Sequence, residues 1–364
     1  MPESSPVATV TVTQHRSIAL DVLRVTAILG VVAIHVFGFV VINPEAHGTL
    51  DWWIATAINV GSRWVVPGFV MVSGALLLGP RVHEMGPAAF YRKRLVRLGP
   101  AFVFWPLFYI LIVRLLLRGE WHGGGWAVYL FFSGSSFTAM YFLWLIAGLY
   151  LVAPVLAAFL RGGGERRAYL FAAVTLAITL AVHAISNAFA EQGYAAPLTA
   201  TGFTQWISYV GYFLAGWALR DVLLSRRWTI VVGIGALGLL IETIWQAAHP
   251  DRYPLLQALL PVGYLGTAVA LIALAVFVLA HSVLRHVPAD GRFGRIVTSL
   301  SAATFGVFLI HLFFIELIRL LLPSVFVALT SNIFVTAGAW LGVVVASFAV
   351  SLVARRIPGV RLVF

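Results

Sequence analysis

Apolar stretches of about 20 residues follow one another along most of this 364-residue chain, separated by short polar segments. A helix of that length crosses the roughly 30 Å of hydrocarbon in a bilayer. Because 61% of the residues are hydrophobic and only 10% are charged, a water-soluble globule could not hide so much apolar surface. The sequence therefore predicts an all-α, polytopic membrane protein.

We expect one membrane domain over residues 17–354, with cytosolic tails at residues 1–16 and 355–364. No small-residue cleavage pattern precedes the first span, which favours a retained tail over a cleaved signal peptide. Arg63 and Pro67 interrupt the second span, so we expect a kinked or broken helix that lines a cavity and brings Ser73 to its wall. The predicted spans, about ten, lie near residues 17–41, 52–79, 100–118, 137–160, 168–189, 204–222, 228–248, 259–281, 299–321 and 332–354.

The basic residues are distributed unevenly between the two sides of this arrangement. Eighteen of the 24 Lys and Arg residues fall on one side, two fall on the other, and four lie within spans. Positive loops stay in the cytosol, so we expect both termini there, and the net charge of +11 reads as a topology signal rather than as a nucleic-acid surface. The chain has no cysteine, which excludes disulfides, thiol nucleophiles and cysteine-ligated metals. Its histidines give only weak support to a zinc site, and we expect no metal.

The first span carries three polar groups on one face. The eleven residues from Arg24 to His35 turn a helix by about 1100° and raise it by about 16.5 Å, so both side chains point the same way, and Asp21 lies one turn before Arg24. If these residues have only a structural role, Asp21 and Arg24 form an ion pair within the helix. Ionisable groups in lipid more often line a substrate or proton path, where His35 can act as a general base and Arg24 can hold an anion or steady developing charge.

A basic segment at residues 90–97 forms the second candidate site. If it is helical, Arg94 and Arg97 share a face and make a two-pronged anion site, with Arg92 and Lys93 beside them. Contact with anionic lipid headgroups explains the segment equally well. The more specific alternative is that this segment binds a phosphorylated soluble cofactor.

Further polar residues lie within later spans. His311 either forms a hydrogen bond to another helix or belongs to the functional site. Glu316 and Arg319 are three residues apart on one helix and most simply form an ion pair with each other. We expect Glu242 to lack an oppositely charged or hydrogen-bonding partner nearby in the sequence, and it either carries a proton or forms a hydrogen bond to another helix. Trp144 by itself fits packing or the membrane interface.

Six segments together resemble, in order, the signatures of the acyltransferase-3 family of integral membrane acyltransferases, and the resemblance covers most of the chain. That family modifies cell-surface polysaccharides and other exported or membrane-accessible molecules. The first segment is the Arg24-to-His35 spacing. The others are VPGFVMVSG at residues 66–74, RLVR at 94–97, LWL through LYLVAP at 143–154, GYFLAG at 211–216 and TFGVFLIH at 304–311.

The resemblance implies transfer of an acyl group, usually acetyl, from cytosolic acyl-CoA to an acceptor hydroxyl beyond the membrane. It implies that Arg94 and Arg97, flanked by Arg92 and Lys93, hold the CoA phosphates. It also implies a multi-pass protein of the bacterial cytoplasmic membrane, with membrane lipid, CoA and a glycan or other hydroxylated acceptor as partners and a homo-oligomer as one option.

The resemblance further implies that His35 is catalytic, with Arg24 and Asp21 beside it. His35 either deprotonates the acceptor or itself carries the acyl group, and both routes remain open. Ser73 and His311 become expected neighbours of the substrate. Trp144 and Glu242 are expected neighbours of the substrate as well. We expect each of these four residues either to touch the substrate or to support a residue that does.

Two other interpretations compete with this one. A proton-coupled transporter or exporter would use Asp21, Arg24, His35 and Glu242 as a relay, although the chain lacks the internal repeat of common transporter designs. An acyltransferase that acts on a lipid or a secondary metabolite keeps the chemistry and changes only the acceptor. Turnover of a thioester separates the first rival from the enzyme.

Overall fold

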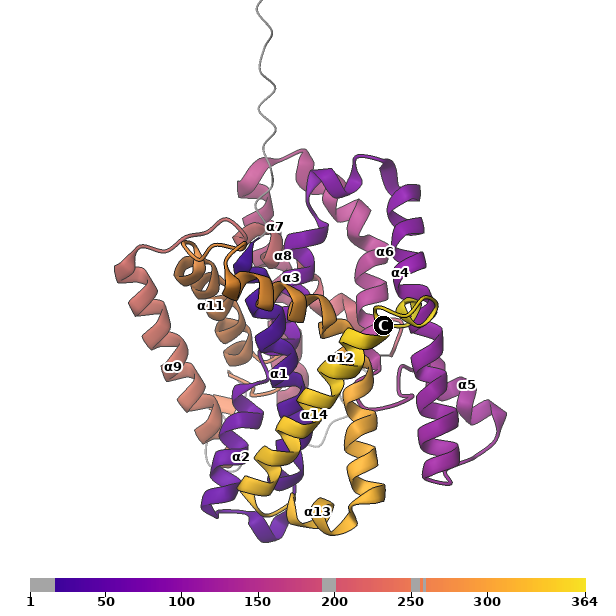
Figure 1. The fold of residues 1–364 in the computed structure, drawn as a ribbon. Helices are drawn as coiled ribbons and strands as arrows, with labels where there is room; N and C mark the ends of the chain where they lie inside the picture. The colour runs from indigo at the N-terminus through magenta and orange to yellow at the C-terminus, as the bar shows by residue number, and fades with distance from the viewer. Residues whose placement is uncertain (1–16, 192–200, 250–255, 258–259) are drawn as a thin grey trace, which may run out of the picture.

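The computed structural model describes residues 17–191, 201–249, 256–257 and 260–364, and all regular structure within them is helical (Figure 1). The expected tail at residues 1–16 lies outside the described residues. The helices are α1 Ile18–Val41, α2 Leu50–Gly61, α3 Val65–Leu77, α4 Gly86–Phe108, α5 Gly124–Phe132, α6 Tyr141–Arg161, α7 Gly164–Glu191, α8 Val210–Leu219, α9 Arg226–Ala248, α11 Thr267–Leu284, α12 Arg292–Leu321, α13 Pro323–Ala328 and α14 Ile333–Ala354.

Nine helical segments in the described part of the chain are long and apolar enough to cross a membrane. The all-α, polytopic architecture predicted from the sequence is therefore confirmed. The second of these segments, Leu50–Leu77, is broken into α2 and α3 by a turn at Ser62–Trp64, as the positions of Arg63 and Pro67 predicted.

The predicted span at residues 204–222 is much shorter than expected. It consists of a 3₁₀ helix, Gln205–Tyr209, followed by the ten-residue α8. A Cβ atom added at Gly216 would collide with the Met71 carbonyl, and one added at Gly74 would collide with the Phe213 carbonyl. These two glycines let the backbones of α3 and α8 touch, which is the close packing that small residues permit between membrane helices. Because α8 is buried against α3 in this way, it is a core element.

The helix that carries the basic segment is longer than predicted. The span was predicted near residues 100–118, but α4 begins at Gly86 and continues into a π-helix, Tyr109–Leu117. Pro106 precedes the π-helix and removes a backbone donor from the ladder, which is a common origin of such irregularity. The chain end packs back on this helix, since Trp105 Nε1 donates a 2.6 Å hydrogen bond to the Val363 carbonyl.

The first helix lies at the centre of the bundle and runs beside α12 in the same direction (Figure 1). Near its start, Ser301 Oγ of α12 donates a 2.6 Å hydrogen bond to the Asp21 carboxylate. Further along, Asn59 Nδ2 of α2 donates to the Ile34 carbonyl at 2.8 Å, and Trp340 Nε1 of α14 donates to the Leu29 carbonyl at 3.2 Å. Polar contacts with three helices thus fix the position of α1.

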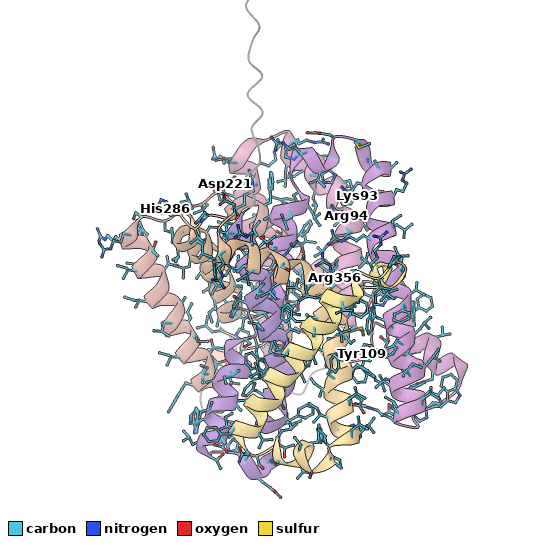
Figure 2. The ribbon with its side chains drawn as sticks, viewed as in Figure 1. Lys93, Arg94, Tyr109, Asp221, His286 and Arg356 are labelled. Atoms are coloured by element: carbon cyan, nitrogen blue, oxygen red, sulfur yellow. The ribbon has the colours of Figure 1, made fainter. Side chains whose placement is uncertain are left out.

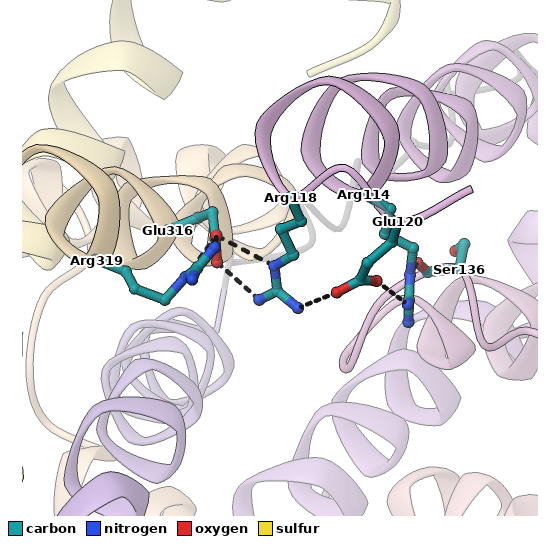
Figure 3. A network of polar contacts seen from close by, with 6 residues as sticks. All are labelled: Arg114, Arg118, Glu120, Ser136, Glu316 and Arg319. Atoms are coloured by element: carbon teal, nitrogen blue, oxygen red, sulfur yellow. Dashed lines mark hydrogen bonds and ion pairs between the residues drawn. The ribbon is translucent and has the colours of Figure 1, made fainter.

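A chain of charged side chains joins the end of the π-helix to α12 (Figure 3). The buried carboxylate of Glu316 accepts hydrogen bonds from Arg118 Nε at 3.1 Å and Nη2 at 2.7 Å, and it also pairs with Arg319. Glu120 bridges Arg118 to Arg114. The predicted Glu316–Arg319 pair is confirmed, and it belongs to a larger network that includes Arg114, Arg118 and Glu120.

Candidate functional site

A cavity of about 1300 Å³ opens between α1, α3, α4, α6, α8 and α12, and we call it the large cavity. Six arginines and three acidic residues are among the described residues that line it. Figure 2 shows Arg94 and Asp221, two of these residues, toward the end of the molecule opposite α13. The charged lining residues are Arg24, Arg81, Arg94, Arg97, Arg220, Arg355, Asp21, Glu84 and Asp221. The guanidinium groups outnumber the carboxylates, so the lining of the large cavity is positively charged.

Both arginines of the RLVR segment reach this cavity, as their three-residue spacing on a helix predicted. The Arg94 guanidinium lies 5.3 Å from the ring centroid of Phe90 and 5.7 Å from that of Tyr150. Aromatic faces on two sides hold an arginine in place without neutralising it. Arg94 therefore presents a permanent cation to the large cavity.

The positive potential at this wall also acts on His83, in the 3₁₀ helix Pro80–His83 outside the spans. Burial lowers the pKa of the His83 imidazole, and the nearby charges of Arg161 and Arg94 lower that pKa further, although a hydrogen bond with the Leu77 carbonyl opposes the shift. His83 thus stays neutral beside the arginines.

Two flanking basic residues lie elsewhere. Arg92 and Lys93 are exposed on α4 and line neither the large cavity nor the second cavity that surrounds His35. Their positions therefore differ from those of Arg94 and Arg97, which line the large cavity. Their position suits contact with lipid headgroups or solvent.

A second cavity, of about 200 Å³, contains His35, and we call it the small chamber. Phe69, Phe142 and Phe308 line both this chamber and the large cavity. The ring centroids of Phe69 and Phe142 are 6.2 Å apart, and those of Phe142 and Phe308 are 5.3 Å apart. Three phenylalanines thus form the boundary between the arginine-lined space and the histidine.

His311 of α12 lies directly behind His35, with the two ring centroids 5.3 Å apart. His311 is fully buried, and its Nδ1 lies 2.8 Å from the Phe308 carbonyl and 3.2 Å from the Val307 carbonyl. Because carbonyl oxygens only accept, Nδ1 carries the proton and Nε2 presents a lone pair. That Nε2 atom is buried and has no hydrogen-bond partner within the described residues.

The polar face of α1 therefore serves two cavities. Asp21 and Arg24 line the large cavity, whereas His35 lines the small chamber. Asp21 is held by the hydroxyls of Ser301 at 2.6 Å and Thr298 at 3.3 Å. The three side chains were expected to share one site, but Phe69, Phe142 and Phe308 lie at the boundary between the cavity that Arg24 lines and the chamber that His35 lines.

The remaining predicted residues divide between the cavity wall and more distant positions. Ser73 lines the large cavity and donates its hydroxyl proton to the Phe69 carbonyl at 2.9 Å. Trp144 lines neither cavity, and its Nε1 donates to the Phe131 carbonyl at 3.0 Å. Glu242 lies on α9, away from both cavities, and the expectation that it lacks a local partner was wrong, because Gln246 Nε2 donates to it at 2.8 Å.

Sequence reasoning missed several lining residues. Arg220 and Arg355 were counted only as topology signals, although the fold brings both to the large cavity. Tyr141, Tyr264 and Thr138 add three hydroxyl groups to the small chamber. Nothing in their local sequence distinguishes them from interfacial residues, since only the packing of α6 and the start of α11 around His35 unites them.

No curated protein and no solved structure matches the chain. The family model of the acyltransferase-3 domain, described as an acyltransferase domain, matches residues 17–356, which span both cavities and nearly the whole chain. The protein therefore belongs to the acyltransferase-3 family and is a polytopic membrane acyltransferase.

Proposed function

We propose that the protein transfers a short acyl group, acetyl being the expected one, from cytosolic acyl-CoA to a hydroxyl of a cell-surface glycan or another exported acceptor. The observation that carries this proposal is the direct adjacency of an arginine-lined cavity and a histidine-containing chamber. The first suits a polyanionic donor, and the second suits proton transfer at the end of that donor.

The large cavity suits CoA in both charge and size. CoA carries a diphosphate and a ribose phosphate, and Arg94 and Arg97 provide planar, permanent cations for such groups. A volume of about 1300 Å³ exceeds what an ordinary small ligand fills. In this proposal the pantetheine arm passes the Phe69, Phe142 and Phe308 boundary and delivers the thioester to the small chamber.

His35 then acts as the general base. It takes the proton of the acceptor hydroxyl, and the acceptor oxygen attacks the thioester carbonyl carbon. The carbon–sulfur bond breaks, and the departing CoA sulfur takes the proton from His35, which returns to its neutral form. The products are the ester and free CoA.

His311 supports His35 in this scheme. When His35 holds the extra proton, the His311 Nε2 lone pair is a buried acceptor beside it. Arg24 has a different task, because it lines the large cavity and faces the donor rather than the thioester carbonyl. Of the two roles considered for Arg24, the geometry favours holding an anionic group.

The topology follows from the same proposal. The large cavity faces the cytosol, where acyl-CoA is made, and the acceptor reaches the small chamber from the other side. Both chain ends then lie in the cytosol of a bacterial cell, in agreement with the distribution of Lys and Arg.

The proposal is tested by thioester turnover with purified protein in liposomes. Acetyl-CoA is supplied with glycans, lipids or small hydroxylated metabolites in separate reactions, and free CoA and acceptor mass are measured. We expect CoA release and an acylated product with one acceptor class, and a loss of about 10²–10⁴-fold in rate for His35→Gln. His183→Gln is the matched control, because His183 lies within α7 and lines neither cavity.

Two results would overturn the proposal. One is the absence of CoA release with every acceptor class, together with movement of an acceptor across the membrane, which is the behaviour of a transporter. The other is full activity of His35→Gln.

A further inference from the structure

The small chamber needs a donor for the charge that acyl transfer develops. Attack on a thioester places negative charge on the carbonyl oxygen, and enzymes stabilise that oxygen with hydrogen-bond donors fixed in advance. Arg24 lies across the phenylalanine boundary, so the donor must come from another residue. Among the described residues, the polar side chains that line the chamber besides His35 are those of Thr138, Tyr141 and Tyr264.

Tyr264 is held by a tight turn directly before α11. The Gly266 amide donates a 2.8 Å hydrogen bond to the Gly263 carbonyl. A Cβ atom added at Gly266 would collide with the Pro261 carbonyl, so the close backbone approach requires glycine. The turn fixes the backbone that presents Tyr264 to the chamber.

Arg63 approaches the same turn from the break between α2 and α3. Its Nη1 donates a 2.7 Å hydrogen bond to the Val262 carbonyl, two residues before Tyr264. Tyr264 lies outside the membrane-spanning segments, and burial raises the pKa of its phenol while the Arg63 charge opposes that rise. The phenol therefore stays protonated at neutral pH, and a cation beside it strengthens its O–H group as a donor.

The Tyr264 hydroxyl is also available. It makes no hydrogen bond with the described residues, and the chamber that it faces contains His35. Tyr141 presents a second phenol, but the arginine beside Tyr264 distinguishes the two, because a fixed cation favours the donor whose partner oxygen becomes negative.

We propose that Tyr264 is a catalytic residue whose hydroxyl donates a hydrogen bond to the thioester carbonyl oxygen, and that Arg63 is a positioning residue that acts through Tyr264. This inference rests on the proposed function. As the acceptor oxygen bonds to the carbonyl carbon, the carbonyl electron pair moves onto the oxygen that Tyr264 holds. When the carbon–sulfur bond breaks, that pair returns to restore the carbonyl, and Tyr264 keeps its own proton throughout.

The test compares Tyr264→Phe with Tyr212→Phe in steady-state acetyl-CoA turnover by the full-length protein in liposomes. Tyr212 is the matched control, because it is a buried tyrosine of α8 that lines neither cavity, and its hydroxyl has no hydrogen-bond partner in the described residues. We expect Tyr264→Phe to lower kcat by about 100-fold, as loss of one oxyanion donor does, while KM for acetyl-CoA changes less than twofold. Tyr212→Phe keeps the wild-type kcat.

The role of Arg63 is tested in the same assay. Arg63→Gln is expected to lower kcat by about 10-fold, and Arg63→Lys, which keeps the cation, is expected to recover part of that loss. Combining Arg63→Gln with Tyr264→Phe should add little to the effect of Tyr264→Phe alone, because the cation acts through the phenol.

A kcat for Tyr264→Phe within twofold of wild type overturns the inference and leaves the proposed function intact. Equal losses for Tyr264→Phe and Tyr212→Phe overturn it as well, since they indicate a general packing effect. Absence of turnover in the wild-type protein overturns the proposed function and this inference with it. Binding of acetyl-CoA by Tyr264→Phe, measured alongside, verifies that the variant is folded.

Discussion

The ring centroids of His35 in α1 and His311 in α12 lie 5.3 Å apart. The Nε2 atom of His311 is buried and has no hydrogen-bond partner among the described residues. The two helices run in the same direction, and near the start of α1 they are joined by the hydrogen bond from Ser301 to Asp21. This hydrogen bond contributes to the register between α1 and α12, on which the spacing between the histidines depends.

Two substitutions of His311 separate its two nitrogens. His311→Asn keeps a donor near the Nδ1 position and removes the Nε2 acceptor, and we expect it to lower the rate of CoA release about 10–100-fold, the effect of losing one hydrogen bond to a charged group. His311→Gln places its amide oxygen nearer the Nε2 position and should retain more activity. Equal rates for wild type and His311→Asn would show that His311 only packs α12.

The arginine pair and the flanking basic pair make a matched comparison. Replacing Arg94 and Arg97 by Gln removes two cations from the large cavity, so we expect KM for acyl-CoA to rise by roughly 10–100-fold with little change in kcat. Replacing Arg92 and Lys93 by Gln removes the same charge from the exposed side of α4 and should leave KM unchanged. If both double variants raise KM equally, general surface charge rather than the cavity attracts the donor.

The contact between α3 and α8 predicts a strong dependence on glycine. Gly74→Ala and Gly216→Ala each force a methyl group into the backbone of the facing helix, which should destabilise the protein by about 1–3 kcal/mol or more. Gly238→Ala on α9 meets open space and should be neutral or slightly stabilising. Apparent melting temperature in detergent measures the difference, and a stable Gly216→Ala would refute the close packing of α8.

The charged network at the end of the π-helix predicts different costs for its two acids. Glu316 is 3% exposed and bound by two partly exposed arginines, so Glu316→Gln removes hydrogen bonds between charged groups and should cost about 1.5–3 kcal/mol. Glu120 is 35% exposed, and Glu120→Gln should cost no more than about 1 kcal/mol. Similar melting temperatures for the two variants would show that the network is not buried as described.

Nine of the ten predicted spans correspond to helical segments of membrane-crossing length in the described residues, and apolar length alone located them, because a lipid-crossing helix has a minimum length. The helical spacing of Arg94 and Arg97 likewise predicted that they share a face. The failure at α8 has a physical cause: an apolar stretch predicts a span whether it meets lipid or other helices, and the glycines that bury α8 against α3 act only in three dimensions.

The site was predictable to the extent that its residues share one helix. Asp21, Arg24 and His35 do, and their common face follows from helical geometry. The boundary that separates Arg24 from His35 does not follow, since Phe69, Phe142 and Phe308 come from three other helices. Contributions to one cavity from helices distant in sequence carry no local pattern.

The measurement that tests the account most directly is a density map of the protein with a non-transferable acyl-CoA analogue, in which a thioether replaces the thioester. The account predicts phosphate density against Arg94 and Arg97 in the large cavity. It further predicts that the acyl end passes Phe142 and lies within hydrogen-bond reach of His35 in the small chamber. Phosphate density away from these arginines, or an acyl end that remains on the large-cavity side of the three phenylalanines, would contradict it.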